Sequence, residues 1–442
     1  MAIDLTTTSA GRSDRPRLAG RPLRRVLVAA GAGSVIEYYD FGVYAFLATT
    51  LAVVFFPSQD LGTALLSTLA IFASAFVMRP IGGVVIGHIG DHFGRKAGLA
   101  TAVIMMAVCT AAIGLIPSHA SIGIAAPLLL VLLRCGQGFA AGGELGGASS
   151  YVAESVADDR RGLFSSIPQL GCLVGTALGS LTVAVLTIVL TPEQMQDWGW
   201  RVPFLFSIAL SVAAVLFRRK MAESPDFESL EAGDAVRRLP VFEAIKKHPL
   251  AIVSVFGINL VSFAAFYLVF TYMTTYFDVV DVMSARSASW AVVVTQVLAA
   301  LAIPFWGHIS DRIGRKPVLV GVCVANLVLA IPLFVLIGSG NTVLAIACLI
   351  VLGQFEGAYL GVISSCYCEM FPASVRASGF NLGFNLSAII AGGSAPYIAT
   401  WLIENTGDDK SPAYFLTAAA ALSLVTVWKI KETAGKPLPL DS

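Results

Sequence analysis

Charged side chains are scarce in this sequence. Asp, Glu, Lys and Arg make up 13% of the 442 residues, whereas 56% are hydrophobic and the mean hydropathy is +0.79. A soluble domain carries roughly 25% charged residues, so the composition excludes an ordinary soluble protein. Short segments of alternating polarity, which a membrane β-barrel needs, are also lacking. The remaining class is a membrane protein built of α-helices.

Signals of catalysis and metal binding are missing too. The sequence contains no nucleophile elbow and no phosphate-binding loop, and its five histidines fall mostly in loops: His88, His92, His119, His248 and His308. The seven cysteines lie almost wholly in apolar runs, and the close pair Cys366 and Cys368 suits neither a zinc site nor a redox pair. We therefore expect buried free thiols, no enzyme activity, no metal, no cofactor and no nucleic-acid partner. A membrane sensor is disfavoured because no substantial soluble domain follows Trp428.

Long apolar runs are what the sequence has in abundance. Twelve runs approach the length of about 20 residues that a helix needs to cross a bilayer. They lie at 26–54, 62–86, 97–116, 123–153, 162–190, 200–218, 248–277, 286–306, 317–338, 342–371, 375–403 and 412–429. The first run is too long for a signal-peptide core and has no Ala-x-Ala exit, so we expect it to remain as the first span.

A charged decapeptide occurs twice in the chain. Gly87–Lys96 reads GHIGDHFGRK and Gly307–Lys316 reads GHISDRIGRK, with seven of ten positions identical. Such a repeat indicates two similar halves, and both copies are expected to form loops in water. We predict a tail at 1–25, a six-helix bundle at 26–218, a linker at 219–247, a second six-helix bundle at 248–430 and a tail at 431–442.

Basic residues are concentrated on one side of the predicted spans. The N-terminal arginines, both decapeptides, the linker and the exit of the last span lie on that side, whereas the opposite loops carry mainly Asp and Glu. Loops rich in Lys and Arg stay in the cytoplasm. We therefore expect both termini and both decapeptides to be cytoplasmic, in a bacterial inner or plasma membrane.

A second charged pattern also occurs once in each half. Glu154 precedes Arg161, and Glu369 precedes Arg376, by seven residues between the fourth and fifth spans of the respective half. An exposed ion pair is worth about 0–1 kcal/mol, so only a network biases a conformational equilibrium of a few kcal/mol. We hypothesise that such a network forms a cytoplasmic gate; alternatively, the charges only set topology. The proposed gate comprises Asp91, Arg95, Lys96, Glu154, Arg161, Asp311, Arg315, Lys316, Glu369 and Arg376.

The decapeptide pattern Gly-x-x-x-Asp-x-x-Gly-Arg-Lys resembles the loop motif of the major facilitator superfamily. Three further segments narrow the resemblance: Glu37-Tyr-Tyr-Asp40-Phe-Gly in span one, Arg134-Cys-Gly-Gln137-Gly in span four and Asp197-Trp-Gly-Trp-Arg201 before span six. Together they are similar to the metabolite:proton symporter family, which includes proline/betaine, citrate, α-ketoglutarate and shikimate permeases. The resemblance covers nearly the whole chain.

This resemblance implies an all-α fold of twelve transmembrane helices in two pseudo-symmetric six-helix bundles. It implies proton-coupled uptake of a small carboxylate-bearing metabolite, such as proline, betaine, citrate or α-ketoglutarate, by alternating access at a site between the halves. The partners are then the substrate, protons and the lipid bilayer, and the protein works as a monomer. Efflux or exchange on the same fold stays an alternative. The long C-terminal coiled coil of some osmosensing betaine porters is lacking, so osmosensing of that kind is not expected.

Acidic residues inside the spans are candidate proton carriers, because a charge in the membrane costs several kcal/mol without a partner. Glu37 and Asp40 are three residues apart on one helical face, where their mutual repulsion favours a proton on one of them. Structural pairing with arginine or hydroxyl donors is the alternative. Glu144 in span four suits either a proton relay or helix packing. Glu356 in span ten suits either an added proton site or a partner for a substrate cation, and it disfavours a tricarboxylate.

Arg134, with Gln137 one turn later, is the candidate carboxylate-binding residue. A guanidinium forms a bidentate fork with a carboxylate, so we hypothesise that Arg134 alternates between an acid of span one and the substrate. A fixed structural salt bridge is the alternative. Arg79, near the end of span two, is interpreted as an interfacial residue with a structural role.

The rest of the pocket is expected to be polar but uncharged. Hydrogen bonds to a small solute are predicted from Tyr38, Asn259, Tyr267, Asn381 and Asn385. Small residues let helix backbones approach closely, and this is predicted in spans four and five at Gly138, Gly142, Gly143, Gly147, Gly171, Gly175 and Gly179.

Overall fold

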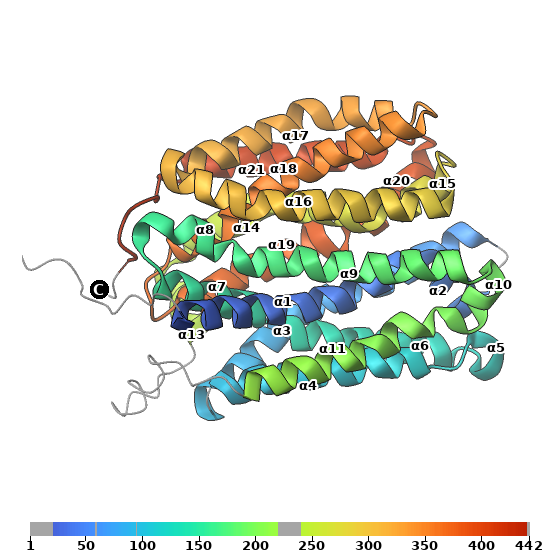
Figure 1. The fold of residues 1–442 in the computed structure, drawn as a ribbon, viewed down its shortest axis with the longest axis horizontal. Helices are drawn as coiled ribbons and strands as arrows, with labels where there is room; N and C mark the ends of the chain where they lie inside the picture. Colours follow the sequence, from blue (N-terminus) through green and yellow to red (C-terminus); the bar gives the residue numbers. More distant parts are fainter. Residues whose placement is uncertain (1–20, 58–59, 94, 220–239, 440–442) are drawn as a thin grey trace, which may run out of the picture.

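The computed structural model describes residues 21–57, 60–93, 95–219 and 240–439. Within these ranges the regular elements are helices, and the long ones run alongside one another (Figure 1). In the first half they are α1 (Arg21–Phe46), α2 (Ala48–Phe55), α3 (Leu61–Phe93), α4 (Arg95–Leu115), α5 (His119–Ile122), α6 (Ala125–Ala141), α7 (Glu144–Ser155), η1 (Asp158–Arg160), α8 (Arg161–Ser165), α9 (Ile167–Val189), α10 (Pro192–Gln194), η2 (Met195–Gly199) and α11 (Arg201–Arg219).

The second half repeats this helical arrangement. Its elements are α13 (Pro240–Lys247), α14 (Pro249–Tyr267), η3 (Leu268–Tyr272), α15 (Met273–Val279), α16 (Ala285–Ile313), α17 (Arg315–Ile337), α18 (Thr342–Cys368), α19 (Arg376–Ser387), η4 (Ala388–Gly393), α20 (Ala395–Thr406) and α21 (Ser411–Lys429). In Figure 1, α16, α17, α18 and α21 form one side of the molecule and α3, α4, α6 and α11 form the other. Between them, α9 packs against α16 and α7 packs against α19.

The predicted spans correspond to helices of the structure. Ten helical stretches in the described residues are long and apolar enough to cross a membrane, and two shorter ones, Ala100–Leu115 and Arg201–Val212, bring the total to twelve. The all-helical fold with six spans in each half is therefore confirmed. The exact bundle boundaries stay predictions, since residues 1–20 of the N-terminal tail and 220–239 of the linker lie outside the described residues.

The second decapeptide is not a loop, contrary to the prediction. The helix α16 continues to Ile313 and α17 begins at Arg315, so only Gly314 separates the two. Gly314 has φ +104°, which a residue with a Cβ rarely adopts, and this permits the sharp turn. At the first decapeptide, α3 reaches Phe93 and α4 begins at Arg95. The side chains predicted for the gate there, on Asp91, Arg95 and Lys96, lie outside the described residues.

Several spans are interrupted partway along their length, and the fourth, seventh and eleventh spans show this clearly. The fourth span breaks at Gly142 and Gly143 between α6 and α7. The seventh and eleventh spans contain π-helical turns, η3 and η4. Such interruptions leave backbone groups that need other partners, and π-helical turns are frequent at functional sites. The interrupted spans are therefore candidates to line a functional site between the halves.

Glycines bring helices of the first half into close contact. A Cβ added to Gly138 or Gly142 would overlap the carbonyl oxygens of Ala75 and Arg79 on α3. Gly175 of α9 is equally close to the backbone of α1 at Val35. Close packing, predicted for spans four and five, is confirmed at these glycines, but the prediction is wrong for Gly147, where an added Cβ would have no atom within 4 Å.

Candidate functional site

The first half buries an ion pair deep between its helices. Arg79 Nη2 of α3 lies 3.1 Å from Glu37 Oε1 of α1, and the two side chains are 1% and 4% exposed. The Arg79 guanidinium also lies over the rings of Phe41 and Phe76, 4.4 and 4.6 Å from their centroids. The prediction that Arg79 is interfacial is therefore wrong, because a carboxylate and two ring faces replace water around its charge.

Asp40 is connected to Arg134 through two neutral side chains. Thr110 of α4 donates to Asp40 Oδ2 at 2.7 Å and accepts from Gln137 Nε2 at 2.6 Å. Gln137 Oε1 in turn accepts from Arg134 Nη1 at 2.7 Å. All four side chains are fully buried. Glu37 and Asp40 thus have separate partners, and Arg134 reaches the acid of span one indirectly.

Several buried polar atoms around these arginines have no hydrogen-bond partner among the described residues. They include Nε and Nη2 of Arg134, Nε of Arg79, the hydroxyl of Tyr267 and Oδ1 of Asp40. Buried polar groups are nearly always paired, so this arrangement is suited to an additional ligand. Guanidinium and hydroxyl donors suit a carboxylate.

Aromatic rings from both halves surround the two guanidinium groups. Arg134 lies over Tyr44 and Phe72, 4.3 and 5.1 Å from the ring centroids. Tyr267 of the second half packs against Phe72 and Phe76, with centroids 5.7 and 5.2 Å apart. Ring faces attract cations, including quaternary ammonium groups. We call this set the aromatic cluster: Phe41, Tyr44, Phe72, Phe76, Phe266 and Tyr267.

A small cavity adjoins the aromatic cluster at Phe266. Its walls are Tyr38, Gln169, Asn259, Ser262, Phe263, Phe266, Leu360, Ile363 and Phe384. In this conformation the cavity has room for about one water molecule. We call it the central cavity.

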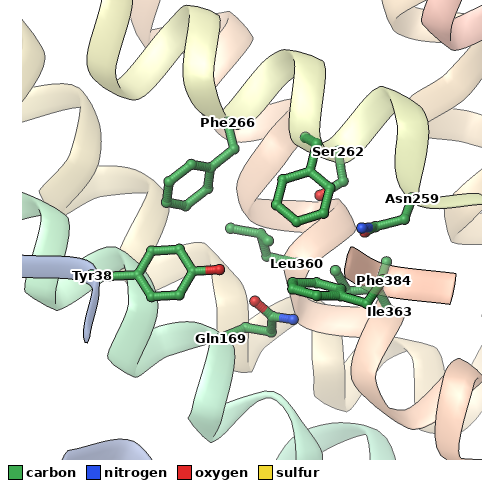
Figure 2. Close-up of a pocket in the computed structure, with 9 residues that line it drawn as sticks. Tyr38, Gln169, Asn259, Ser262, Phe266, Leu360, Ile363 and Phe384 are labelled. Atoms are coloured by element: carbon green, nitrogen blue, oxygen red, sulfur yellow. The ribbon is translucent and has the colours of Figure 1, made fainter. Parts of the chain in front are cut away.

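The central cavity is lined from both halves. Figure 2 shows Tyr38 and Gln169 of the first half opposite Phe266, Ser262 and Asn259 of α14. Tyr38 and Asn259 were predicted pocket residues, and the structure brings them together. Sequence reasoning missed Gln169 and Ser262, whose only signal is a polar side chain within an apolar run.

Glu356 of α18 lies behind the cavity wall. Its Oε1 accepts from the lining hydroxyl of Ser262 at 2.6 Å, and its side chain is 1% exposed. Asn259 accepts from Tyr367 at 3.0 Å and donates to Ser387 at 2.9 Å. The second half thus presents neutral polar groups to the cavity, with an acid directly behind one of them.

Asn381 and Asn385 do not line the central cavity, contrary to the prediction. Asn381 accepts from Gly146 N at 3.0 Å and donates to Gly143 O at 3.1 Å, while Asn385 donates to Gly142 O at 2.7 Å. These backbone groups belong to the break between α6 and α7. Two asparagines of the second half therefore provide the hydrogen-bond partners that the backbone of the interrupted helix in the first half lacks.

Glu144 is the first residue of α7, directly after the same break. Its side chain is buried, with 7% exposed. This position lies beside the backbone groups that Asn381 and Asn385 contact. Proton relay and helix packing both stay open as predictions for Glu144.

Buried ion pairs connect the halves at one end of the molecule. We call this end, where α1 begins and the chain leaves α21 (Figure 1), the terminal face. Arg161 of the first half lies 3.1 Å from Glu369 of the second, and Glu154 of the first half pairs with Arg376 of the second. Arg315 lies 3.2 Å from Glu369. The terminal-face network comprises Glu154, Asp158, Arg161, Asp311, Arg315, Glu369 and Arg376.

Asp311 of the second decapeptide contributes to this network in two ways. Its carboxylate lies 2.9 Å from Arg315 within its own half. It also accepts from the backbone N–H groups of Gly162 and Leu163 in the first half, at 2.7 and 3.0 Å. One carboxylate thus binds both the arginine beside it and the start of the opposite α8.

The chain after α21 joins this network, which sequence reasoning missed. Thr433 donates to Glu369 at 2.5 Å, and the carbonyl of Lys436 accepts from Arg161 at 3.1 Å. Glu432 accepts from the N–H groups of Arg315 and Lys316 at the start of α17, each at 2.9 Å.

Lys316, predicted as part of the gate, does not pair with an acid of the network. Its Nζ donates to the carbonyls of Trp428 and Ile430 at 2.6 and 3.0 Å. These carbonyls lie at the end of α21, where helical carbonyls lack partners and attract a cation. Lys316 therefore caps α21 while its neighbour Arg315 joins the network.

The cysteines are free thiols. Six are buried and Cys135 is partly buried. In the part of the chain that the structure describes, no group of three His, Cys, Asp or Glu side chains is placed to hold a metal ion.

The fold is that of a multi-pass membrane protein. The family described as "Sugar (and other) transporter" matches residues 26–249, and the family described as "Major Facilitator Superfamily" matches residues 281–441. The chain is 36% identical over 426 residues to the proline/betaine transporter of Salmonella typhimurium, covering 94% of this chain and 85% of that protein. It is also 36% identical over 425 residues, with the same coverages, to the glycine betaine/proline/ectoine/pipecolic acid transporter OusA of Dickeya dadantii.

Solved structures share the same fold. The proton:xylose symporter XylE, bound to 6-bromo-6-deoxy-D-glucose, aligns with a TM-score of 0.77 at 18% identity, covering 94% of this chain and 97% of that one. A partially occluded inward-open XylE from E. coli aligns with a TM-score of 0.75 at 19% identity, covering 94% and 99%. This chain therefore belongs to the major facilitator superfamily and, within it, to the metabolite:proton symporter family.

Proposed function

We propose that this protein imports a small zwitterion of the proline and betaine class together with protons. The observation that carries the proposal is Arg134: its Nε and Nη2 lack partners among the described residues, and it is surrounded by aromatic rings. A carboxylate bound by guanidinium donors and an ammonium group held against ring faces are complementary to such a ligand. The names of the relatives that share this family support the same substrate class.

Asp40 is the acid that couples proton binding to substrate binding. While ionised, it polarises the chain Thr110–Gln137–Arg134 and attracts the guanidinium. A proton on Asp40 removes that attraction and leaves Arg134 to the substrate carboxylate. Glu37 is less suited to this role because Arg79 already neutralises it at 3.1 Å.

Alternating access opens the site to one side of the membrane at a time. The terminal face is cytoplasmic in this proposal, because the basic residues of the sequence are concentrated there. The terminal-face network then acts as the cytoplasmic gate. The transporter works as a monomer in a bacterial plasma membrane, with the proton gradient as its energy source.

A substrate panel tests the proposal. Purified protein in proteoliposomes is supplied with labelled glycine betaine, proline, citrate and α-ketoglutarate at two external pH values. Uptake of the first two, stronger with the more acidic exterior, is expected. A preference for citrate or α-ketoglutarate contradicts the proposed substrate class, and export driven by inward proton flow shows an efflux porter instead.

A further inference from the structure

Glu356 differs from the buried acids of the first half in its surroundings. Glu37 has an arginine at 3.1 Å, and Asp40 is linked to Arg134 through hydrogen bonds. Glu356 has one hydrogen-bond partner among the described residues, the neutral hydroxyl of Ser262. No described cation lies within ion-pair distance of it.

No described charge on the helices that pack against α18 forms an ion pair with Glu356. Among these helices, α7 carries Glu144 and Glu154, and α8 carries Arg161, which pairs with Glu369. The titratable groups that interact with Glu356 are Cys323 of α17 and Tyr367 of α18 itself, and Tyr359 lies beyond them against Cys323. The two tyrosine hydroxyls donate elsewhere, to Ile258 O at 2.7 Å and to Asn259 at 3.0 Å. The helix α14 contains no charged residue, and the charged residues of α16 lie at its ends.

An ionised carboxylate in these surroundings is costly. Transfer of a charge into a low-dielectric interior costs several kcal/mol unless a counter-charge and hydrogen bonds replace water. One hydroxyl does not replace a hydration shell. Glu356 is therefore the neutral carboxylic acid in this conformation, whereas Glu37 beside Arg79 is ionised.

Ser262 gives this buried proton a path. Its hydroxyl is both the partner of Glu356 at 2.6 Å and part of the wall of the central cavity, across from Tyr38 and Gln169 (Figure 2). When the cavity opens to solvent, the Ser262 hydroxyl turns toward it, and the carboxyl group then donates to Ser262 Oγ and passes its proton to that oxygen while the hydroxyl proton of Ser262 leaves to solvent. The carboxyl O–H bond breaks, a new serine O–H bond forms, and the carboxylate keeps the negative charge.

We propose that Glu356 is a second proton-carrying acid, loaded in this conformation and discharged through Ser262 into the central cavity. Each half then carries one proton-coupled acid, Asp40 in the first and Glu356 in the second, and two protons accompany each substrate. This inference rests on the proposed symport and adds its proton stoichiometry. A zwitterion carries no net charge. The second proton therefore increases the substrate concentration gradient that the transporter can reach, and it does not alter recognition of the substrate.

The test counts protons per substrate in proteoliposomes. The glycine betaine gradient at which net flux stops is measured against imposed pH gradients for the wild type and Glu356→Gln, with the exposed loop variant Glu193→Gln as control. Per tenfold proton gradient, the balancing substrate gradient is expected to fall from about a hundredfold in the wild type to about tenfold in Glu356→Gln. An unchanged stoichiometry in Glu356→Gln that still transports overturns the proposal.

Infrared difference spectroscopy tests the proton itself, even if Glu356→Gln does not transport. The wild type should show a protonated carboxylic acid C=O band that is absent in Glu356→Gln and shifted in Ser262→Ala. The inference is overturned if Glu356→Gln removes no carboxylic acid band of the wild type; a band that Asp40 contributes is expected to remain in this variant. Failure of the wild type to move betaine or proline contradicts the proposed function instead, and leaves this infrared readout intact.

Discussion

Three buried carboxylates of this transporter have the same chemistry but different neighbours. Glu37 faces a guanidinium, Asp40 faces a hydroxyl that leads to one, and Glu356 faces only a hydroxyl. The free energy of holding a charge in the membrane depends on those neighbours. The roles we assign therefore follow from the partners rather than from the residue type.

Replacing Arg134 tests its role as the carboxylate ligand. Arg134→Ala removes the donors Nε and Nη2, and a hydrogen bond to a charged group is worth about 1.5–3 kcal/mol. Binding of glycine betaine to the purified protein should weaken about 10- to 100-fold. Arg134→Lys should recover only part of this loss, because an ammonium cannot form the planar fork. Isothermal titration provides the measurement.

The exposed variant Arg286→Ala serves as the control for that experiment and should bind as the wild type does. Unchanged affinity in Arg134→Ala would contradict the assignment, and the substrate carboxylate would then belong to Arg79.

Breaking the pair between Glu37 and Arg79 should cost stability. Glu37→Gln leaves a buried guanidinium without its counter-charge, which costs about 3–5 kcal/mol. The double variant Glu37→Gln, Arg79→Gln should be closer to the wild type than Glu37→Gln alone. Thermal unfolding in detergent measures this difference.

A matched comparison is the exposed pair of Glu243 and Lys247, whose N and O atoms are 2.8 Å apart. Glu243→Gln should cost about 0.3–0.5 kcal/mol. Equal losses for the buried and exposed pairs would show that the ion pair of Glu37 and Arg79 is not structurally important.

At this scale the sequence predicts which residues are unusual but not what they contact. A carboxylate or guanidinium inside an apolar run is visible as an exception, and Glu37, Asp40, Arg134 and Glu356 were found in this way. The depth of Arg79 was missed because its partner lies 42 positions away in the chain on another helix. Hydropathy carries no information about such a pairing.

At the scale of elements, the broken fourth span is the most informative. A continuous helix would pair the carbonyl of Gly142 with the N–H of Gly146. Here those two groups bind Asn385 and Asn381 of α19 instead. The break therefore joins the two halves beside Glu144, between the central cavity and the terminal-face network.

Removing this contact should favour opening at the terminal face. Asn385→Ala leaves the carbonyl of Gly142 without its partner, at a cost of about 1–3 kcal/mol that applies only while the halves are closed. The native thiol of Cys368 reports on opening, because it is fully buried and 4.0 Å from Ser150 of the other half. Maleimide labelling of Cys368, mapped by mass spectrometry, should accelerate in Asn385→Ala.

The variant Asn405→Ala, which removes an exposed amide from α20, is the matched control and should label at the wild-type rate. Labelling of Cys368 that is equally slow in Asn385→Ala would indicate that the asparagines only complete the helix and do not hold the halves together.

Glu432 anchors the chain after α21 to the start of α17. Its partial burial opposes ionisation, but the N–H groups of Ala434, Arg315, Lys316 and Thr433 donate to the carboxylate and lower the pKa of Glu432. A lowered pKa in the folded state adds stability above the unfolded pKa, about 4.3. That stability is lost as the pH falls through the folded pKa.

The variant Glu432→Gln should therefore be less stable than the wild type at pH 7, by about 1 kcal/mol for a lost cap at a helix start. The difference should shrink as the pH falls below the unfolded pKa of about 4.3 and disappear below the lowered folded pKa of Glu432. Melting curves across this pH range provide the check. A difference that is independent of pH would mean that the charge of Glu432 does not contribute.

The helices were predicted well from the sequence, whereas the connections and contacts between them were predicted poorly. The bilayer sets the length and apolar composition of a span, and both can be read from one continuous stretch of sequence. The ends of most of the twelve predicted spans therefore lie within a few residues of the observed helix ends. The continuation of α16 to Ile313 was missed because Gly-punctuated charged segments are typical of loops. Asn381, Asn385 and Glu432 contact elements that are distant in the sequence. In the sequence alone, the two asparagines suited a polar cavity and Glu432 suited a solvent-exposed tail.

On the scale of the whole molecule, the two halves are joined by different chemistry at different depths. Ion pairs and backbone hydrogen bonds join them at the terminal face, whereas aromatic contacts such as Tyr38 with Phe266, 5.6 Å apart, join them around the cavity. Ser180 of α9 also donates to Gln296 of α16 at 2.5 Å. Alternating access requires that these contacts break and form in turn.

The repeat of charged motifs predicted this two-fold organisation from sequence alone. The decapeptides and the Glu/Arg pairs occur once per half, and Glu154, Arg161, Glu369 and Arg376 meet across the interface. The aromatic cluster could not be predicted, because Phe or Tyr occurs in most of the predicted spans. Only the packing of α14 against the first half selects the six rings that surround the arginines.

Proton-coupled uptake of a zwitterion can be measured directly in proteoliposomes. Proteoliposomes containing the wild-type protein are placed in labelled glycine betaine with an acidic exterior, with and without an uncoupler. Proton coupling predicts accumulation above the external concentration that collapses when the uncoupler is added. Uptake that only equilibrates, or accumulation that ignores the uncoupler, would contradict it.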